Sequence, residues 1–232
     1  AELRISPDSD MAGKTLAELD FTEEVVPKSF NVKAPVFPFI KFPGTDTLLG
    51  PEMRSTGEVM GIDTSFGKAF FKAELSAGTE LPTTPDNGLV FLSLADPDKP
   101  AGLVVAQRCR ALGLGIAATS GTAAYLAKFG FEVDEIVAKV QNTGEVVDTA
   151  EGRSTAPELI EQGKIAFVVN TPRGRGARSD GQTIRKAASM HRVSCVTTVD
   201  AALAAAQGLG EQSGALEVRS LQEYHAAGAD AS

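Results

Sequence analysis

Small hydroxyl side chains gather where a short apolar segment meets an alanine-rich one. Residues 118–122 read Ala-Thr-Ser-Gly-Thr, after the apolar residues 114–117 and before the segment 123–129. This order is typical of a strand, a tight turn and a helix. The first N–H groups of a helix have no partner within the helix and, with the helix dipole, favour an anion such as a phosphate. Alternatively, Thr119 or Ser120 only caps the helix, and these residues by themselves leave both interpretations open.

The segments around this turn alternate between strand and helix. Strands are predicted over residues 89–94, 114–118, 133–140, 165–170, 193–196 and 218–221. Helices are predicted from Asp96 or Asp98 to residue 112, and over residues 123–129, 156–162, 181–190 and 199–207. Such alternation predicts an α/β fold in which a parallel sheet carries helices on both faces.

Four of the predicted strands end in polar residues. The side chains concerned are those of Ser93 and, shortly after it, Lys99, then Thr119 and Thr122, Lys139, and Asn170. Ligands of open α/β sheets bind beyond the carboxyl ends of the strands, where these groups converge. A charge-assisted hydrogen bond there contributes about 1.5–3 kcal/mol when it is partly buried. Each residue also has an ordinary structural explanation, but together they predict a site for a small phosphate-bearing molecule.

A loop with three arginines follows the fourth of these strands. It covers residues 171–180 and places Arg173, Arg175 and Arg178 near glycines. The loop either closes over a phosphate or stays solvated at the surface, and its composition favours neither.

The first third of the chain has a different pattern. Five prolines within residues 27–51 predict edge strands and extended chain. Residues 64–77 show the spacing of an amphipathic helix, and residues 78–88 have the composition of a linker. We therefore expect two units, residues 1–82, which resemble the tail of a larger domain, and residues 83–232.

Composition excludes several classes of function. The net charge of -8 and pI near 4.9 argue against a general nucleic-acid-binding protein. No apolar run approaches the ~20 residues that a membrane span needs, and the first residues lack a signal-peptide pattern. Cys109 and Cys195 are expected to be buried apolar residues rather than a disulfide, and two histidines without a Cys/His cluster predict no zinc site. A cytoplasmic protein is expected.

Two sets of motifs resemble the carbamoyl-phosphate synthase large chain family. Residues 39–44 (FIKFPG) and 50–61 (GPEMRSTGEVMG) resemble the end of its second ATP-grasp unit. The polar strand ends resemble its C-terminal regulatory domain, which has the methylglyoxal-synthase-like, Rossmann-like fold. In that family the domain binds nucleotides, and UMP inhibits and IMP activates many bacterial members. The resemblance assigns effector contacts to Ser93, Lys99, Thr119, Thr122, Lys139 and Asn170.

The chain departs from the family pattern at several positions. Pro172 replaces a threonine, which removes one hydroxyl contact. Leu49 and Thr197 match the ornithine site of bacterial members, but Ala34 and Cys195 stand where a Glu and a Tyr are expected. Because the missing carboxylate would pair with the ammonium group of ornithine, these replacements argue against ornithine regulation.

The resemblance also implies what lies outside this chain. It implies no catalytic centre and no cofactor here, with ATP and Mg or Mn bound in the full-length enzyme. The implied partners are the upstream ATP-grasp domains, a glutamine amidotransferase small chain, and further copies in an oligomer. Two alternatives remain: a methylglyoxal-synthase-like lyase acting on dihydroxyacetone phosphate, with Asp148 or Asp180 as the base that the reaction needs, and a module that mainly holds subunits together.

Overall fold

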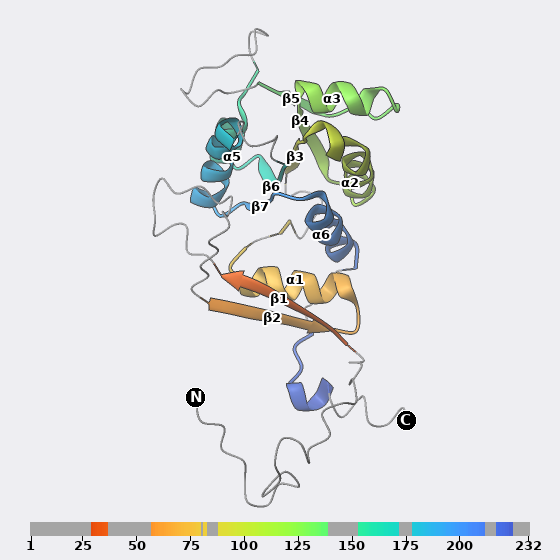
Figure 1. The fold of residues 1–232 in the computed structure, drawn as a ribbon, viewed down its shortest axis with the longest axis vertical. Helices are drawn as coiled ribbons and strands as arrows, with labels where there is room; N and C mark the ends of the chain where they lie inside the picture. Colours follow the sequence, from red (N-terminus) through yellow and green to blue (C-terminus); the bar gives the residue numbers. More distant parts are fainter. Residues whose placement is uncertain are drawn as a thin grey trace, which may run out of the picture.

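The computed structural model describes residues 29–36, 57–79, 81–82, 88–138, 153–171, 178–211 and 217–224, with the backbone only at 178–180. Lys139, Leu49, Asp148 and residues 172–177 lie outside this part, as do the side chains of Arg178 and Asp180. The strands are β1 (Phe30–Val36), β2 (Gly57–Asp63), β3 (Leu89–Ser93), β4 (Gly115–Thr119), β5 (Glu135–Val137), β6 (Ile165–Asn170) and β7 (Ser194–Val196) (Figure 1). The helices are α1 (Phe66–Ser76), the short 3-10 helix η2 (Asp96–Asp98), α2 (Lys99–Ala111), α3 (Ser120–Ala127), α4 (Ala156–Glu161), α5 (Arg178–Met190) and α6 (Val199–Glu211).

Five strands form the main sheet, and all its neighbouring strands are parallel. Their order is β5-β4-β3-β6-β7, so β3 lies at the centre with β4 and β6 on either side. The chain leaves β3 toward β4 but leaves β6 toward β7, in the opposite direction. The carboxyl ends of β3 and β6 therefore flank the topological switch point, where open α/β sheets bind their ligands. The predicted α/β fold is confirmed.

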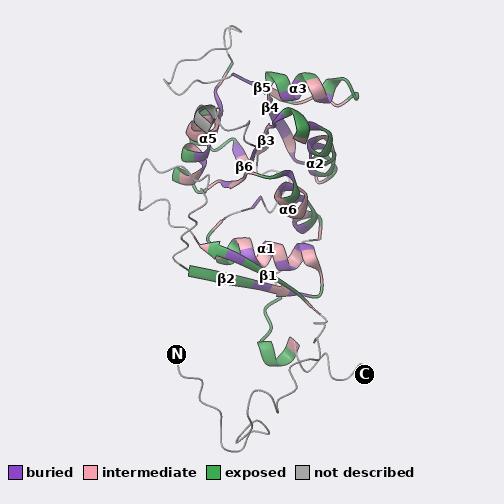
Figure 2. Cartoon of the chain, viewed as in Figure 1, coloured by how far each residue is buried: buried purple, intermediate pink, exposed green. Residues whose placement is uncertain are grey.

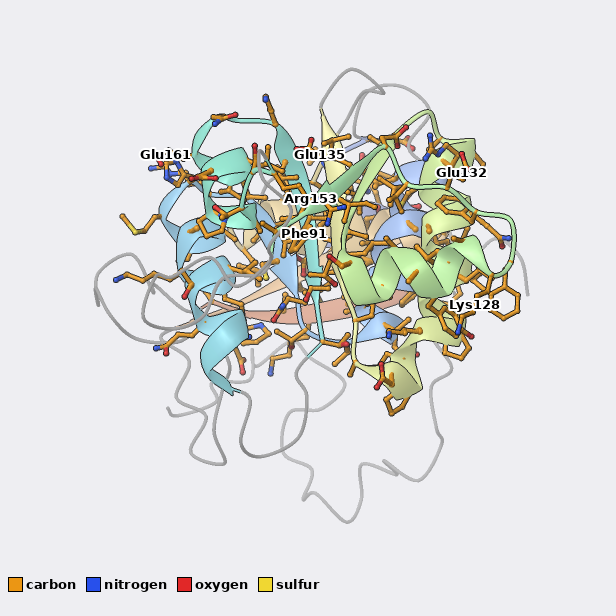
Figure 3. All side chains as sticks on the ribbon, turned by 90° about the horizontal axis from the view of Figure 1, so that it is seen from above. Phe91, Lys128, Glu132, Glu135, Arg153 and Glu161 are labelled. Carbon is orange, nitrogen blue, oxygen red and sulfur yellow. The ribbon has the colours of Figure 1, made fainter. Side chains whose placement is uncertain are left out.

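Helices cover both faces of this sheet. Alternate residues of β3 point to opposite faces, and Val90 and Leu92 pack with α2, α3 and α6, whereas Phe91 packs with α4 and α5. Figure 1 accordingly shows α5 on one side of the sheet and α2 and α3 on the other. Buried residues concentrate on the strands and on the helix faces turned toward them (Figure 2). In Figure 3 the fully buried Phe91 lies near the middle of the view, and the exposed Lys128 and Glu161 lie toward its rim.

The N-terminal elements form a second, smaller layer. β1 and β2 pair antiparallel, with Val32 opposite Gly61. Helix α1 packs on both strands and, on its other side, on α6 (Figure 1). Glycines allow both contacts: a Cβ at Gly61 would overlap the Ala69 carbonyl oxygen, and a Cβ at Gly208 would lie 2.7 Å from the carbonyl oxygen of Gly67. The small layer is thus in backbone contact with the last helix of the main fold.

Most predicted elements appear within a few residues of their expected bounds. The helix predicted at 64–77 is α1, and β1 is an extended segment of the proline-rich region. Strand β2 was not predicted. The last predicted strand, 218–221, is wrong: residues 217–220 are irregular and 221–224 form one helical turn. The reason is a capping box, because Ser220 Oγ accepts from the Glu223 N–H at 3.2 Å while the Glu223 carboxylate accepts from the Ser220 N–H at 2.6 Å.

Cys109 and Cys195 do not form a disulfide. Cys109 is buried in α2, as predicted, and Cys195 is half-buried in β7. Across the described ranges, no helix has the length and apolar character needed to cross a membrane.

Candidate functional site at the carboxyl edge of the sheet

The ends of β3 and β6 bring two of the predicted residues together. Ser93 and Asn170 are register partners on adjacent strands, although they lie far apart in the sequence. The Thr171 N–H donates to the Ser93 carbonyl oxygen at 3.0 Å, which extends the pairing one residue beyond Asn170. Asn170 is buried and Ser93 is half-buried. The switch point of the sheet therefore carries a carboxamide and a hydroxyl side by side.

Strand β4 adds the hydroxyl groups of the turn into α3. Thr119 is the N-cap residue of α3, but its side chain makes no capping hydrogen bond. Its Oγ1 donates to the Oγ1 of Thr122 at 3.1 Å, and the Thr122 oxygen also accepts from the Leu94 N–H at 3.1 Å. Thr122 has 0% of its surface exposed. The hydrogen bond of Thr122 therefore connects α3 to the residue after β3. Thr119 is half-buried, so its hydroxyl group lies nearer the surface than that of Thr122.

Thr171 secures the same turn from the other side. Its Oγ1 accepts from the Ala95 N–H at 2.8 Å, so threonines from two elements hold the consecutive amides of Leu94 and Ala95. Buried backbone N–H groups need such partners when they leave the sheet. Thr171 directly follows the fourth of the predicted strands that end in polar residues, and the resemblance assigned no effector contact to it.

Lys99 places a cation at the start of the helix that follows β3. It is the first residue of α2 and only 8% exposed. Its Nζ lies 2.6 Å from Asp96 Oδ1 and 6.0 Å from the centre of the Tyr125 ring. A buried ammonium group needs such a counterion, and the side chain of Asp96 is 77% exposed. Because the Asp96 carboxylate neutralises the ammonium group, an incoming anion would have to replace Asp96, whose side chain lies mostly in solvent.

A buried arginine was missed by sequence reasoning. Arg185 of α5 donates from Nη1 to Asn170 Oδ1 at 2.7 Å, and its side chain is only 1% exposed. A signal was present, because Arg185 lies three residues before the fully buried Ala188 and so falls on the helix face that meets the sheet.

The structure brings five of the six predicted effector residues to one edge. Ser93, Lys99, Thr119, Thr122 and Asn170 end adjacent strands or begin the helices that follow them. The sixth, Lys139, and the ornithine-site residue Leu49 lie outside the described residues. Thr197 follows β7, the outermost strand, so β6 separates it from the end of β3.

The chemistry of this edge favours an anion. An ammonium group, hydroxyls and a carboxamide are suitable donors for a phosphate, and α2 and α3 begin at the same edge. Within the part of the chain that the structure describes, no three His, Cys, Asp or Glu side chains gather in a way that would hold a metal ion.

Comparison with known proteins agrees with this architecture. Residues 102–197 match the family model described as the MGS-like domain. The carbamoyl phosphate synthase large chain of Synechocystis sp. is 48% identical over 217 residues, which cover 92% of this chain and 19% of that protein. The protein of the same name from Xanthomonas campestris pv. campestris is 47% identical over 215 residues (93% and 19%), and that from Pseudomonas putida is 43% identical over 218 residues (93% and 19%).

This chain spans about a fifth of the length of these relatives. The matched part is their C-terminal region. The chain accordingly matches the MGS-like domain over residues 102–197 and, along almost its whole length, resembles the C-terminal region of carbamoyl phosphate synthase large chains.

Proposed function

We propose that this chain is the regulatory C-terminal region of a carbamoyl phosphate synthase large chain and that its sheet edge binds a nucleoside monophosphate. The observation that carries the proposal is the juxtaposition of Ser93 and Asn170 at the switch point, with Thr119 at the end of the neighbouring strand β4 and Lys99 at the start of α2. The relatives support the enzyme assignment, since they are carbamoyl phosphate synthase large chains. UMP, as inhibitor, and IMP, as activator, are the effectors that the resemblance implies.

The phosphate is the part of the ligand that this edge suits best. Lys99 supplies a charge, Ser93 and Thr119 supply hydroxyls, and Asn170 supplies an amide. Each charge-assisted hydrogen bond contributes about 1.5–3 kcal/mol, so two or three of them account for measurable affinity after the ordering costs of binding. Lys139, which follows the β5 region in the sequence, is proposed as a second ammonium group.

The remaining functions are proposed for the longer protein. Residues 1–82 would complete an ATP-grasp unit whose upstream part binds ATP with Mg or Mn and performs the ligase reaction. The reaction serves arginine and pyrimidine biosynthesis in the cytoplasm, with a glutamine amidotransferase small chain as partner. The effector acts by binding unequally to two states of the enzyme, and typical coupling free energies are about 1–3 kcal/mol. Further copies of the chain are proposed to form an oligomer.

Isothermal titration calorimetry with UMP, IMP, uridine and inosine tests the nucleotide site on this chain. The nucleotides should bind and the nucleosides should not, because the phosphate supplies most of the contacts. Lys99→Met should weaken nucleotide binding about tenfold or more, as expected for losing one charge-assisted hydrogen bond. Lys164→Met is the matched control, because the exposed Lys164 precedes β6 at the opposite end of the sheet.

Absence of heat and of a thermal shift at millimolar nucleotide would refute the proposal. Two further measurements separate it from the alternatives. Formation of methylglyoxal from dihydroxyacetone phosphate would identify a lyase instead. If the protein binds no nucleotide and light scattering shows that it assembles equally well with and without nucleotide, it is an assembly module.

A further inference from the structure

Arg185 is a buried cation in contact with one of the proposed ligand-binding residues. We propose that Arg185 is a positioning residue: it holds the Asn170 carboxamide with its oxygen toward α5, so that the amide NH2 group faces the ligand. The ligand atom opposite Asn170 is then a hydrogen-bond acceptor, such as a phosphate oxygen. This inference rests on the proposed function and adds to it a residue and an orientation that the sequence motifs do not assign.

The orientation follows from the donors and acceptors of the two groups. The Asn170 carboxamide has an oxygen that only accepts and a nitrogen that only donates, whereas a guanidinium group only donates. Nη1 of Arg185 lies 2.7 Å from Oδ1 of Asn170, in a pair that is buried. Flipping the carboxamide would turn its NH2 group toward the guanidinium and leave two donors facing each other. Arg185 therefore selects one of the two possible orientations.

The helix is built to leave room for this pair. A Cβ at Gly181 would overlap Nη1 of Arg185 and lie 2.6 Å from Oδ1 of Asn170. Gly181, Arg185 and Ala188 follow helical spacing, so they share the face of α5 that meets the sheet. Glycine weakens a helix interior relative to alanine, and here the space it leaves is occupied by the hydrogen-bonded pair.

Arg185 acts through Asn170 and does not itself present a surface to the ligand. Its side chain is 1% exposed, whereas Asn170 ends β6 beside Ser93 at the switch point. In the described part of the chain, Arg185 is the one side-chain hydrogen-bond partner of the Asn170 carboxamide. The guanidinium charge also polarises the amide, because hydrogen bonds in series strengthen one another in a low-dielectric site. The amide NH2 group is thereby made a stronger donor.

A double-mutant cycle measured by calorimetry tests this role, with UMP or IMP as the probe. The variants are Arg185→Met, Asn170→Ala and the double substitution, each checked by circular dichroism for folding at the assay temperature. Arg185→Met should weaken nucleotide binding about five- to tenfold in the presence of Asn170, and less than about twofold once Asn170 is alanine. A purely structural arginine would lower thermal stability in both backgrounds without this dependence of the affinity on Asn170.

Gly181→Ala provides a second variant in which both groups remain. The added methyl group displaces the end of the arginine side chain, so nucleotide binding should weaken as in Arg185→Met, even if Arg185→Met itself does not fold. Gly210→Ala is its control, because a Cβ there meets only Leu112 Cδ2 at 3.6 Å, and Arg108→Met removes an exposed arginine.

The outcomes separate this inference from the proposed function. If the wild type binds nucleotide and Gly181→Ala leaves the affinity unchanged, the positioning role alone is overturned. The same holds if the wild type binds nucleotide and Arg185→Met weakens binding equally with and without Asn170. A wild-type chain that binds neither nucleotide nor inorganic phosphate would overturn the proposed function and this inference together.

Discussion

The Oγ1 atom of Thr122 lies 3.1 Å from the backbone nitrogen of Leu94 and accepts its hydrogen. A side chain in the first turn of α3 thus replaces the sheet partner that this amide loses where β3 ends. Thr171 does the same for Ala95 at 2.8 Å. The turn beyond β3, which leads to Lys99, is therefore held by residues that follow the two flanking strands, β4 and β6.

Thr122→Val should destabilise the fold. The substitution keeps the shape of the side chain but leaves the buried Leu94 N–H without an acceptor, which costs about 1–3 kcal/mol. Equilibrium unfolding in urea measures the change. Thr122→Ser retains the hydroxyl and should lose less stability. Equal stability of the valine variant and the wild type would contradict the role given to this hydroxyl.

Gly61→Ala should separate β2 from α1. The added Cβ overlaps the Ala69 carbonyl oxygen and lies 2.5 Å from the Ala73 nitrogen, and neither backbone atom can move without shifting the helix. Overpacking of this kind costs about 1–3 kcal/mol. Gly57→Ala on the same strand is the control, because its Cβ meets nothing within 4 Å. Urea unfolding should distinguish the two variants, and similar stabilities would show that α1 is free to move.

The Asp63–Lys72 pair should make stability depend on pH. Partial burial by itself raises the pKa of Asp63. The Lys72 ammonium group at 2.7 Å and the Ser65 N–H lower this pKa by more than burial raises it, so the pKa lies below the ordinary value of 3.8. A carboxyl group whose pKa is lowered by folding stabilises the protein above its unfolded value, and this stabilisation is lost as the pH falls through the folded pKa.

Asp63→Asn tests this dependence. The variant should be less stable than the wild type near neutral pH, and the difference should shrink as the pH falls below 3.8, the unfolded value. Urea unfolding between about pH 7 and pH 3 provides the measurement. A difference that stays constant over this interval would show that the charge of Asp63 contributes nothing.

Cys109 should resist alkylation while the protein is folded. Burial raises the pKa of its thiol to about 11. Only roughly one thiol in a thousand is then ionised at pH 8, and the thiolate is the reactive form. In a Cys195→Ala variant, mass spectrometry after iodoacetamide treatment should find no label until urea unfolds the chain. Rapid labelling of the folded variant would mean that α2 opens readily.

The strands of the main sheet could be predicted because their composition reflects burial on both faces. Residues 165–170 form an apolar run of the kind that central parallel strands require, and they are β6. β2 could not be predicted in the same way. It contains two glycines, a glutamate and a methionine, and it becomes a strand only by pairing with β1, whose residues lie well before it.

The candidate site was predicted by position but not in its contacts. The rule that parallel strands end at a common edge was sufficient to group Ser93, Thr119 and Asn170. The same rule cannot reveal that the Thr122 hydroxyl is taken up by a backbone amide, or that Arg185 reaches Asn170 from α5. Those contacts depend on side-chain direction and on helix placement, which local sequence patterns do not encode.

Helix α6 makes the two layers mechanically interdependent. It begins at Val199, beyond the carboxyl end of β7, and ends at Glu211, whose carboxylate accepts a hydrogen bond from Ser65 at the start of α1. Its 13 residues make a rod about 20 Å long, so a tilt of about 10° at one end moves the other by about 3 Å. Because Gly67 and Gly208 meet backbone to backbone, no pliable side chain lies between the helices there to absorb such a displacement. A tilt of α6 would therefore have to be accompanied by a movement of α1 or be resisted by it.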